Sequence, residues 1–280
     1  MKQVLQLFYI SIFVSGLLLN IPASADEKIF TVAVVPQFTS NQVYRDWTPL
    51  LAKLERATGY RFKLLAYNEF PRFERSLDQG VPDLVFMNPY HMIIAKRKHQ
   101  YRPLLRDKTP ISGILVVRQD SPIKSLSDLN GKTIAFPSPN ALGASLYIRA
   151  LLAEKIHIKT TPLYVGSHQN VYRHILIGEV AAGGGVTKTL EKETAEVRSQ
   201  LKVLFTTPNI SPHPLAAHPR VPEAVSKKIV AALLAMRNDP ETSKLLEAIQ
   251  MPQPIEADFK RDYAGLSQLK LDSYAEIEAP

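Results

Sequence analysis

Short apolar runs of strand length alternate along this chain with segments whose apolar residues recur at helical spacing, and this alternation restricts the possible folds more than any other feature. The runs at 29–35 and 83–87 are almost continuously apolar, as in strands that are buried on both faces of a parallel sheet. Between them, helical spacing extends from Trp47 to Ala57, and Gly59 then provides a typical C-terminal cap. The pattern predicts an α/β protein with mostly parallel sheets, whose ligands bind at the carboxyl ends of the strands.

A second series of the same kind begins at Thr133. The apolar run at 133–136 is ended by Pro137 and Pro139, and helical spacing follows, so a helix is expected to start between Asn140 and Leu142. Further strands are predicted at 163–165, 181–186, 202–206 and 215–217, and further helices at 170–177, 187–200, 222–236, 239–249 and 257–269.

Two such series, joined by crossings near 117–120 and 206–215, predict a protein of two α/β lobes with a two-segment hinge. Lobe 1 is expected to comprise residues 26–117 and 214–280, and lobe 2 residues 118–213. The segment 215–217 then returns to the first sheet.

The first 25 residues have the pattern of a secretory signal peptide. One Lys precedes an apolar run, and Ala23 to Ala25 form a small-residue cleavage site before Asp26. The chain contains no Cys, which excludes disulfides, a thiol nucleophile and a lipid anchor on an N-terminal Cys. We therefore expect an exported protein located in the periplasm.

The charge balance is moderately basic. The full chain has 34 basic and 26 acidic residues, and without Lys2 the remaining 33 against 26 give a charge of +7. This balance tolerates an anionic ligand, but the basic residues are scattered rather than gathered in long runs, so no nucleic acid partner is expected.

The turn after the 133–136 strand is a candidate wall of a ligand cleft. Its N–H groups at a helix start favour an anion or a polar ligand oxygen, and the small residues Ala141 and Gly143 allow close approach to the backbone. The alternative is an ordinary strand-to-helix turn without a ligand.

Several motifs occur in an order that resembles one family. They are Val34-Val35-Pro36, Trp47-Thr-Pro-Leu-Leu, Thr58-Gly59, Asp83-Leu-Val-Phe-Met-Asn-Pro89, Ser112-Gly113, Leu129-Asn-Gly-Lys-Thr-Ile-Ala-Phe136 and Gly166-Ser-His168. Together they resemble the phosphate/phosphite/phosphonate-type periplasmic solute-binding proteins of ABC transporters. The resemblance implies a type II periplasmic-binding-protein fold with the ligand held between two lobes.

The departures from that family concern the ligand. Phosphonate-binding members have a Ser-Thr-Ser-Gly type run where this chain has Ala141-Leu-Gly-Ala144, so the hydroxyls that cradle the phosphonate are missing. Family residues that bind a ligand amino group correspond here to Lys188 and His213, and the family's pocket Tyr is replaced by the earlier Tyr90. We therefore expect weak binding of aminoalkyl phosphonates.

The candidate ligand contacts lie at the expected strand ends and at positions that the resemblance implies. They are Phe38, Thr39, Asn88, Tyr90, His91, Asn140, Ala141, Leu142, Gly143, Ser145, His168, Lys188 and His213. Structural roles remain open for several of them: Phe38 as a hydrophobic staple, Lys188 as a solvated side chain, and His213 as a stiff hinge residue.

The sequence contains no Gly-x-Ser-x-Gly elbow, His-Glu-x-x-His, Walker-type loop or dinucleotide fingerprint, and no enzyme activity, cofactor or metal is expected. Convergence of His91, His168 and His213 is the only metal alternative. The expected function is that of a monomeric periplasmic protein that closes around a small anionic or zwitterionic solute and delivers it to the permease of an ABC transporter. Docking on a membrane sensor kinase and an exported enzyme on the same fold are the alternatives.

Overall fold

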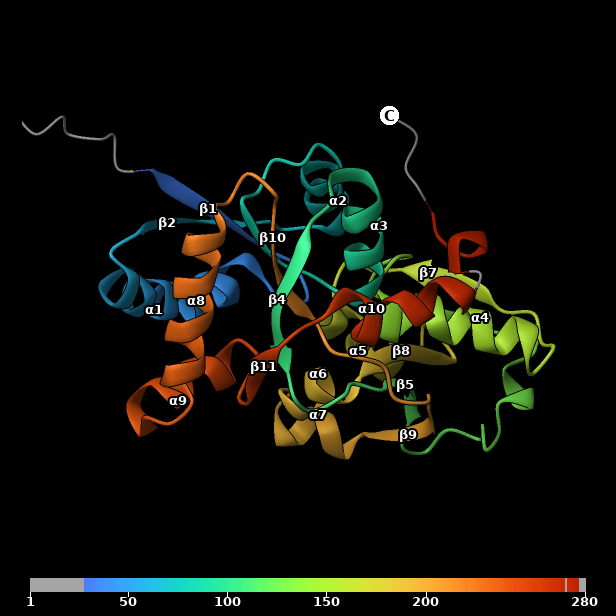
Figure 1. The fold of residues 1–280 in the computed structure, drawn as a ribbon. Helices are drawn as coiled ribbons and strands as arrows, with labels where there is room; N and C mark the ends of the chain where they lie inside the picture. The colour runs from blue at the N-terminus through green and yellow to red at the C-terminus, as the bar shows by residue number, and fades with distance from the viewer. Residues whose placement is uncertain (1–27, 270, 277–280) are drawn as a thin grey trace, which may run out of the picture.

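The structure is a computed structural model that describes residues 28–269 and 271–276 (Figure 1). Two sheets have the strand orders β11-β4-β10-β3-β1-β2 and β7-β6-β8-β5-β9. The six-stranded sheet contains β1 (Ile29–Val34), β2 (Arg61–Ala66), β3 (Leu84–Phe86), β4 (Arg102–Asp107), β10 (Pro214–Ala217) and β11 (Pro254–Glu256). The five-stranded sheet contains β5 (Gly113–Arg118), β6 (Thr133–Phe136), β7 (Thr161–Tyr164), β8 (Ala182–Val186) and β9 (Leu201–Thr206). The predicted signal peptide lies outside the described residues.

Helices surround both sheets, which gives the two predicted α/β lobes, here called the larger and the smaller lobe after their sheets. The larger lobe carries α1 (Ser40–Thr58), α2 (Phe70–Asp78), α3 (Pro89–His99), α8 (Glu223–Met236), α9 (Pro240–Ala248) and α10 (Phe259–Asp262). The smaller lobe carries η1 (Ser127–Leu129), η2 (Leu142–Leu146), α4 (Tyr147–Glu154), α5 (His168–Leu176), α6 (Thr187–Glu191) and α7 (Ala195–Ser199). Two turns of 3₁₀ helix, η3 (Ala264–Leu269) and η4 (Leu271–Ser273), end the described chain.

Both sheets are mixed, with most strands of each running in one direction. In the larger sheet β1 pairs parallel with β2 and β3, but β10 pairs antiparallel with β3 and β4. In the smaller sheet β6 pairs parallel with β7 and β8, whereas β5 is antiparallel to β8 and β9. The reversed strands are β10 and β11 in the larger sheet and β5 in the smaller one. Of these, β5 and β10 are the strands into which the two crossings lead.

The two crossings lie side by side. The first runs from Asp107 to Gly113, ahead of the predicted position near 117–120, because β5 belongs to the smaller sheet. The second runs from Thr206 to Pro214. Ile111 and Ile210 join them, each donating its N–H to the other's carbonyl at 2.9 Å. The connection is therefore a short two-stranded ribbon.

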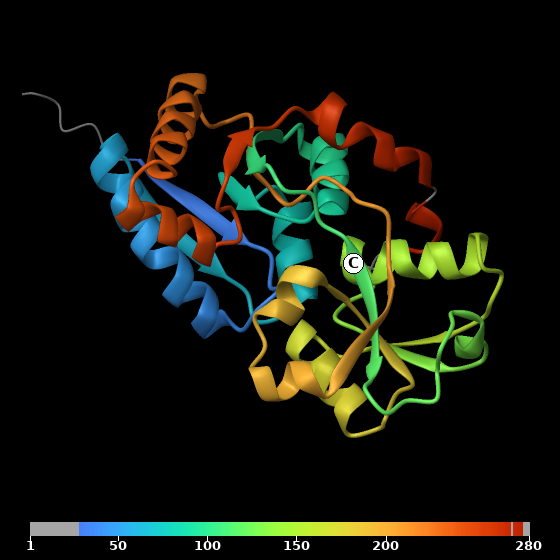
Figure 2. The same cartoon turned by 90° about the horizontal axis from the view of Figure 1, so that it is seen from below.

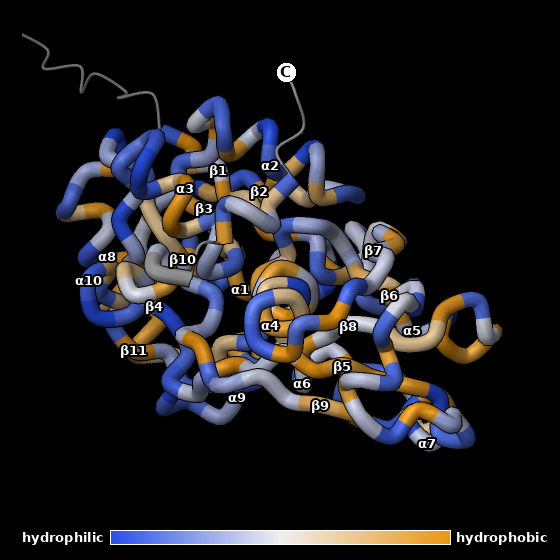
Figure 3. The backbone as a smooth tube through the Cα atoms, turned by 90° about the vertical axis from the view of Figure 1, so that its right-hand side faces the viewer, coloured by the Kyte–Doolittle hydropathy of each residue, from blue (hydrophilic) through white to orange (hydrophobic). Residues whose placement is uncertain are grey.

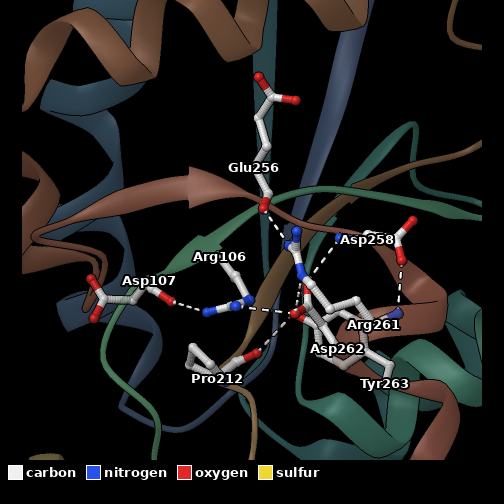
Figure 4. A network of polar contacts seen from close by, with 8 residues as sticks. All are labelled: Arg106, Asp107, Pro212, Glu256, Asp258, Arg261, Asp262 and Tyr263. Atoms are coloured by element: carbon white, nitrogen blue, oxygen red, sulfur yellow. Dashed lines mark hydrogen bonds and ion pairs between the residues drawn. The ribbon is translucent and has the colours of Figure 1, made fainter.

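Polar contacts attach α10 to this ribbon, as Figure 4 shows. Arg106 on β4 forms an ion pair with Asp262 at 3.0 Å, and its guanidinium, with that of Arg261, holds the pKa of the Asp262 carboxyl well below its usual range against the effect of burial. Tyr263 donates its hydroxyl hydrogen to the carbonyl of Pro212 at 3.0 Å. The base of the second crossing is thereby held by the C-terminal part of the chain.

Residues 271–276 form a C-terminal strap that lies across both lobes (Figures 1 and 2). On the larger lobe, the Tyr90 hydroxyl donates to Asp272 at 2.9 Å. On the smaller lobe, the Asn140 side chain donates to the carbonyl of Glu276 at 2.8 Å and accepts from its N–H at 3.1 Å. The strap therefore adds a third link between the lobes.

Two predicted helices are each divided in two. The 187–200 segment forms α6 and α7, because the Thr194 side chain accepts from the N–H of Val197 and starts a new helix. The 257–269 segment forms α10 and η3, with α10 ending at Asp262. The strands β4 and β11 had no counterpart in the sequence prediction.

Apolar side chains fill the interior of each lobe, and Figure 3 shows β5 as an apolar segment beside α4. On α1, Val43, Trp47, Leu50 and Leu54 are buried against the larger sheet, as the helical spacing predicted. Within the residues that the structure describes, no helix has both the length and the apolar character needed to cross a membrane.

Candidate functional site

A narrow cavity lies between the lobes and contains about 260 Å³ of space free of protein atoms, part of it open to solvent. The larger lobe and the second crossing contribute Val35, Gln37, Phe70, Asn88 and His213 to its lining, and the smaller lobe contributes Ala141, Leu142, Gly143, Ala144, His168 and Val186. The predicted cleft wall therefore faces the ends of strands from the opposite lobe.

The wall from the smaller lobe is backbone. Leu142–Leu146 forms a single π-helical turn that continues into α4. Within the described chain, the N–H groups of Leu142, Gly143 and Ala144 have no hydrogen-bond acceptor, since the bonds of this turn begin with later residues. Three neighbouring donors are thus available beside the cavity.

Glycines allow this turn to lie directly on the smaller sheet. A Cβ atom on Gly184 of β8 would be 1.9 Å from the carbonyl oxygen of Ala144, and one on Gly113 of β5 would be 2.0 Å from that of Gly143. Neither position accepts a side chain at that distance. The Gly-rich strand β8 thereby permits close approach beside the cavity at Gly184.

The wall from the larger lobe is held by side-chain amides. Asn88 caps α3, accepting from the N–H of His91 at 2.9 Å, and donates to the carbonyl of Asn140 in the smaller lobe at 3.0 Å. Gln37 accepts from the Gln250 amide at 3.1 Å. Asn88 therefore joins the two sides of the cavity.

Two histidines line the cavity from opposite lobes, and burial keeps both neutral. His168, at the start of α5, is 2% exposed, and burial lowers its pKa to about 4. His213 stacks on Phe86 with ring centroids 5.6 Å apart. Burial, with smaller contributions from His91, Lys188 and His168, lowers its pKa to about 3. Neither ring carries a charge near neutral pH.

The predicted site residues divide into those that line the cavity and those that do not. Asn88, Ala141, Leu142, Gly143, His168 and His213 line it. Of the others, Thr39 caps α1, accepting from the N–H of Gln42, and Phe38 lies under the Lys192 ammonium in a neighbouring hollow. Ser145 is fully buried and accepts from Arg149.

The remaining candidates make contacts around the cavity. Tyr90 packs in an apolar cluster and donates to Asp272, and burial raises the pKa of its phenol. His91 contacts Glu74 through Nε2 at 2.9 Å. Asn140 binds the strap, and Lys188 lies 3.6 Å from Asp107. These residues support the cavity wall or connect the lobes.

Five lining residues were absent from the predicted list: Val35, Gln37, Phe70, Ala144 and Val186. Gln37 directly precedes the candidates Phe38 and Thr39, and Ala144 ends the 141–144 run that the sequence placed at the cleft. Val35 and Val186 are the last residues of apolar runs, a position that marks strand ends. Phe70 begins α2, and no sequence signal distinguishes it from a core residue.

The lining contains no Asp, Glu, Lys or Arg side chain. Within the described ranges, no group of three or more His, Asp and Glu residues has an arrangement that suits a metal ion. The cavity consequently offers neutral hydrogen-bond donors and acceptors and apolar surface.

Comparisons with known proteins agree on one family. Residues 32–263 match the family model described as "ABC transporter, phosphonate, periplasmic substrate-binding protein". The phosphate-import protein PhnD of Mycolicibacterium smegmatis is 23% identical over 223 residues, which cover 71% of this chain and 70% of that protein.

Solved structures show the same fold. A binding protein component of an ABC phosphonate transporter from Pseudomonas aeruginosa superimposes with a TM-score of 0.77 at 17% identity, covering 91% of both chains. PhnD1 of Prochlorococcus marinus, solved with methylphosphonate, has a TM-score of 0.79 at 14% identity and covers 89% of this chain and 99% of its own. The predicted type II periplasmic-binding-protein fold is confirmed.

Proposed function

The chain belongs to the phosphonate-type family of periplasmic substrate-binding proteins of ABC transporters, and on this premise we propose that its lobes close around a small anion and deliver it to a membrane permease. The observation that carries the proposal is the row of three unpartnered N–H groups at Leu142, Gly143 and Ala144 on one side of the interlobe cavity. Neutral donors of this kind stabilise an anion without a cationic side chain.

The cavity favours an anion over the zwitterion that the sequence left open. An ammonium group buried between the lobes needs a carboxylate or several carbonyl acceptors, and the lining has no carboxylate. Burial of an unpaired charge costs several kcal/mol, on the order of the total affinity of many solutes. Aminoalkyl phosphonates are therefore expected to bind weakly, as the missing hydroxyls at 141–144 also predict.

Closure follows from the placement of the site. A solute bound to the 142–144 amides reaches Asn88 and His213 only when the lobes are shut, so it shifts the equilibrium toward the closed form by its differential affinity. We place the hinge at the Ile111–Ile210 pair, with residues 28–110 and 211–276 in the larger lobe and 113–207 in the smaller.

A thermal-shift screen tests the solute class. The panel comprises phosphate, phosphite, methylphosphonate, 2-aminoethylphosphonate, sulfate, small carboxylates and amino acids. A solute at a hundred times its dissociation constant adds about 2.7 kcal/mol to the free energy of unfolding. Stabilisation by amino acids or 2-aminoethylphosphonate but by none of the simple anions would contradict the proposal.

Substitution of His168 tests the place of binding. His168→Ala should weaken the best anion from that screen about tenfold or more, since a buried lining group is lost. His157→Asn, at an exposed position in the same lobe, serves as the matched control and should leave affinity unchanged. An unaltered dissociation constant for His168→Ala would show that the anion binds elsewhere than in this cavity.

Delivery to a permease, rather than docking on a membrane sensor, is the part of the proposal that concerns the partner. Genes for a permease and an ATPase beside the gene for this protein support transport, and an adjacent sensor gene supports sensing.

We further propose an exported monomer without catalytic activity. Mass spectrometry of the recovered solute checks the last point, because a changed mass would reveal turnover.

A further inference from the structure

A buried network of three side chains lies directly behind the cavity. The hydroxyl of Thr189 on α6 is 3.2 Å from Nδ1 of His168, 2.9 Å from the Tyr172 hydroxyl and 2.8 Å from the carbonyl oxygen of Val186. Thr189 and Tyr172 are each 1% exposed. Of these residues, His168 and Val186 also line the cavity.

The backbone is shaped to admit this network. A Cβ atom at Gly185 would be 2.5 Å from the Tyr172 hydroxyl oxygen, so a side chain there would displace the phenol from Thr189. The N–H of Val186 also points to the Thr189 hydroxyl, at 3.3 Å. Thr189 is therefore held from two directions by β8 and from a third by α5.

The hydrogen positions follow from what each atom is able to do. The Val186 carbonyl can only accept and is the nearest neighbour of the Thr189 oxygen, so the single hydroxyl hydrogen lies on that bond. With its hydrogen there, the Thr189 oxygen has two lone pairs for its three other neighbours, and a hydrogen bond to Nδ1 of His168 forms only if Nδ1 carries the imidazole hydrogen. In a neutral ring this leaves Nε2 as a bare acceptor, and Nε2 has no partner among the described residues.

We propose that Thr189 acts as a positioning residue that makes His168 present a lone pair to the cavity, so that the site selects solutes carrying their own hydrogen, namely the singly protonated form of a small tetrahedral oxyanion. The inference rests on the proposed function and deepens it. A fully ionised dianion has no hydrogen to donate. It would place an acceptor oxygen against the acceptor Nε2 of His168, and neither atom would then have a hydrogen bond.

The pH dependence belongs to the solute rather than to the protein. The titratable groups around His168 are Tyr172 on α5, His213 from the second crossing and Lys188 on α6, which is next to Asp107. Burial lowers the pKa of His168 to about 4. It is also the main cause that lowers the pKa of His213 to about 3, and it raises the pKa of Tyr172. From mildly acidic to mildly alkaline pH, His168, His213 and Tyr172 therefore keep their protonation states.

Nitrogen NMR of the solute-free protein tests the tautomer. The His168 signals near neutral pH should show a protonated Nδ1 and a bare Nε2. Thr189→Ser, which keeps the hydroxyl, should retain this pattern, and Thr189→Val, which has the same shape without it, should lose the preference. A proton on Nε2 in the unsubstituted protein overturns the proposal, whether or not Thr189→Val folds.

Binding of matched anions tests the selection. Methylphosphonate and methanesulfonate have the same shape, and both carry one charge while methylphosphonate keeps its hydroxyl hydrogen. Methanesulfonate should bind at least about tenfold more weakly. Sulfate should likewise bind more weakly than phosphate. Above the second pKa of methylphosphonate, its dissociation constant should rise about tenfold per pH unit.

The outcomes separate the two proposals. Equal affinity for methylphosphonate and methanesulfonate, or an affinity for methylphosphonate that is constant across its second pKa, overturns the selection and leaves the anion site standing. Failure of all four anions to bind overturns the proposed function and the selection with it, while the NMR spectrum still decides the tautomer.

Discussion

At the scale of single residues, the cavity depends on neutral groups in places where charged ones are common in anion sites. His168 and His213 are kept uncharged by burial, and Lys188, a candidate from the sequence, lies beside Asp107 instead. The proposed anion would therefore be held by dipoles and hydrogen bonds. Such a site discriminates by the number and direction of hydrogens rather than by charge.

The two histidines make stability fall in mild acid. Their folded-state pKa values, about 4 and about 3, lie below the ordinary value of 6.5. At a pH between these values and 6.5, the unfolded chain therefore binds more protons than the folded protein. Their contribution is complete above pH 6.5 and is lost as pH falls, by up to about 1.4 kcal/mol per pH unit for each histidine. Urea unfolding measured from neutral pH down to mildly acidic pH should show this decline.

His168→Gln provides the comparison, because glutamine does not titrate in this range. The slope between mildly acidic pH and pH 6.5 should become shallower in this variant. An identical slope would mean that His168 is protonated to the same extent in the folded and unfolded states.

Sequence reasoning at this scale located positions better than directions. Asn88, Tyr90 and His91 follow the same strand, and all three were candidates. Successive residues of a helix point about 100° apart, so only the capping residue faces the cavity, while Tyr90 and His91 turn toward the strap and Glu74. Phe70 approaches from another helix, a tertiary placement that no local pattern encodes.

At the scale of elements, the contact between the π-helical turn and β8 determines the shape of the cavity. Gly184→Ala should destabilise the protein by about 1–3 kcal/mol, because the new methyl meets the Ala144 carbonyl and the Phe136 ring. Gly265→Ala is the control, since its Cβ would meet nothing within 4 Å. Chemical unfolding of both variants measures the difference, and equal midpoints would refute the close contact.

The C-terminal strap should stabilise the closed form. Deletion of residues 272–280 removes the Asp272 partner of Tyr90, the backbone partner of Asn140, and the Tyr274 carbonyl to which Arg149 donates at 2.7 Å. Each lost hydrogen bond at a partly buried site contributes about 0.5–1.5 kcal/mol. We expect a lower melting temperature and faster hydrogen exchange at 140–149, and exchange rates unchanged there would argue that the strap is dispensable.

Elements with strong end signals were the ones predicted well. Asp239 caps α9 and Pro240 occupies its first turn, as the sequence indicated. The strand β4 was missed because Arg102, Arg106 and Asp107 interrupt its apolar pattern, and their partners lie far away in the chain. Long-range polar contacts of these side chains offset their burial, and a single sequence does not display such contacts.

At the scale of the whole molecule, contacts opposite the strap also join the lobes. Lys188 on α6 donates to the carbonyl of Gln250, just after α9, at 3.3 Å. Lys192, the C-cap of α6, donates to the carbonyl of Ala248, the last residue of α9, at 3.0 Å. A helix C-terminus is electronegative, so these ammonium groups favour the closed arrangement.

Replacing both lysines should open the solute-free protein. Lys188→Met with Lys192→Met keeps most of the side-chain volume and removes both charges, and the radius of gyration from small-angle X-ray scattering should increase. Lys227→Met, which breaks an exposed pair with Glu223 inside the larger lobe, is the control and should leave it unchanged. A double variant as compact as the parent would show that these contacts do not hold the lobes together.

The position of β10 has a consequence for the order in which the molecule is made. This strand lies between β3 and β4 in the larger sheet, yet it follows the entire smaller lobe in the chain. A ribosome therefore releases β1 to β4 long before the strand that joins β3 to β4 exists. The larger sheet therefore lacks an interior strand until the smaller lobe has been synthesised, so the larger lobe is the last part of the molecule that can complete its fold.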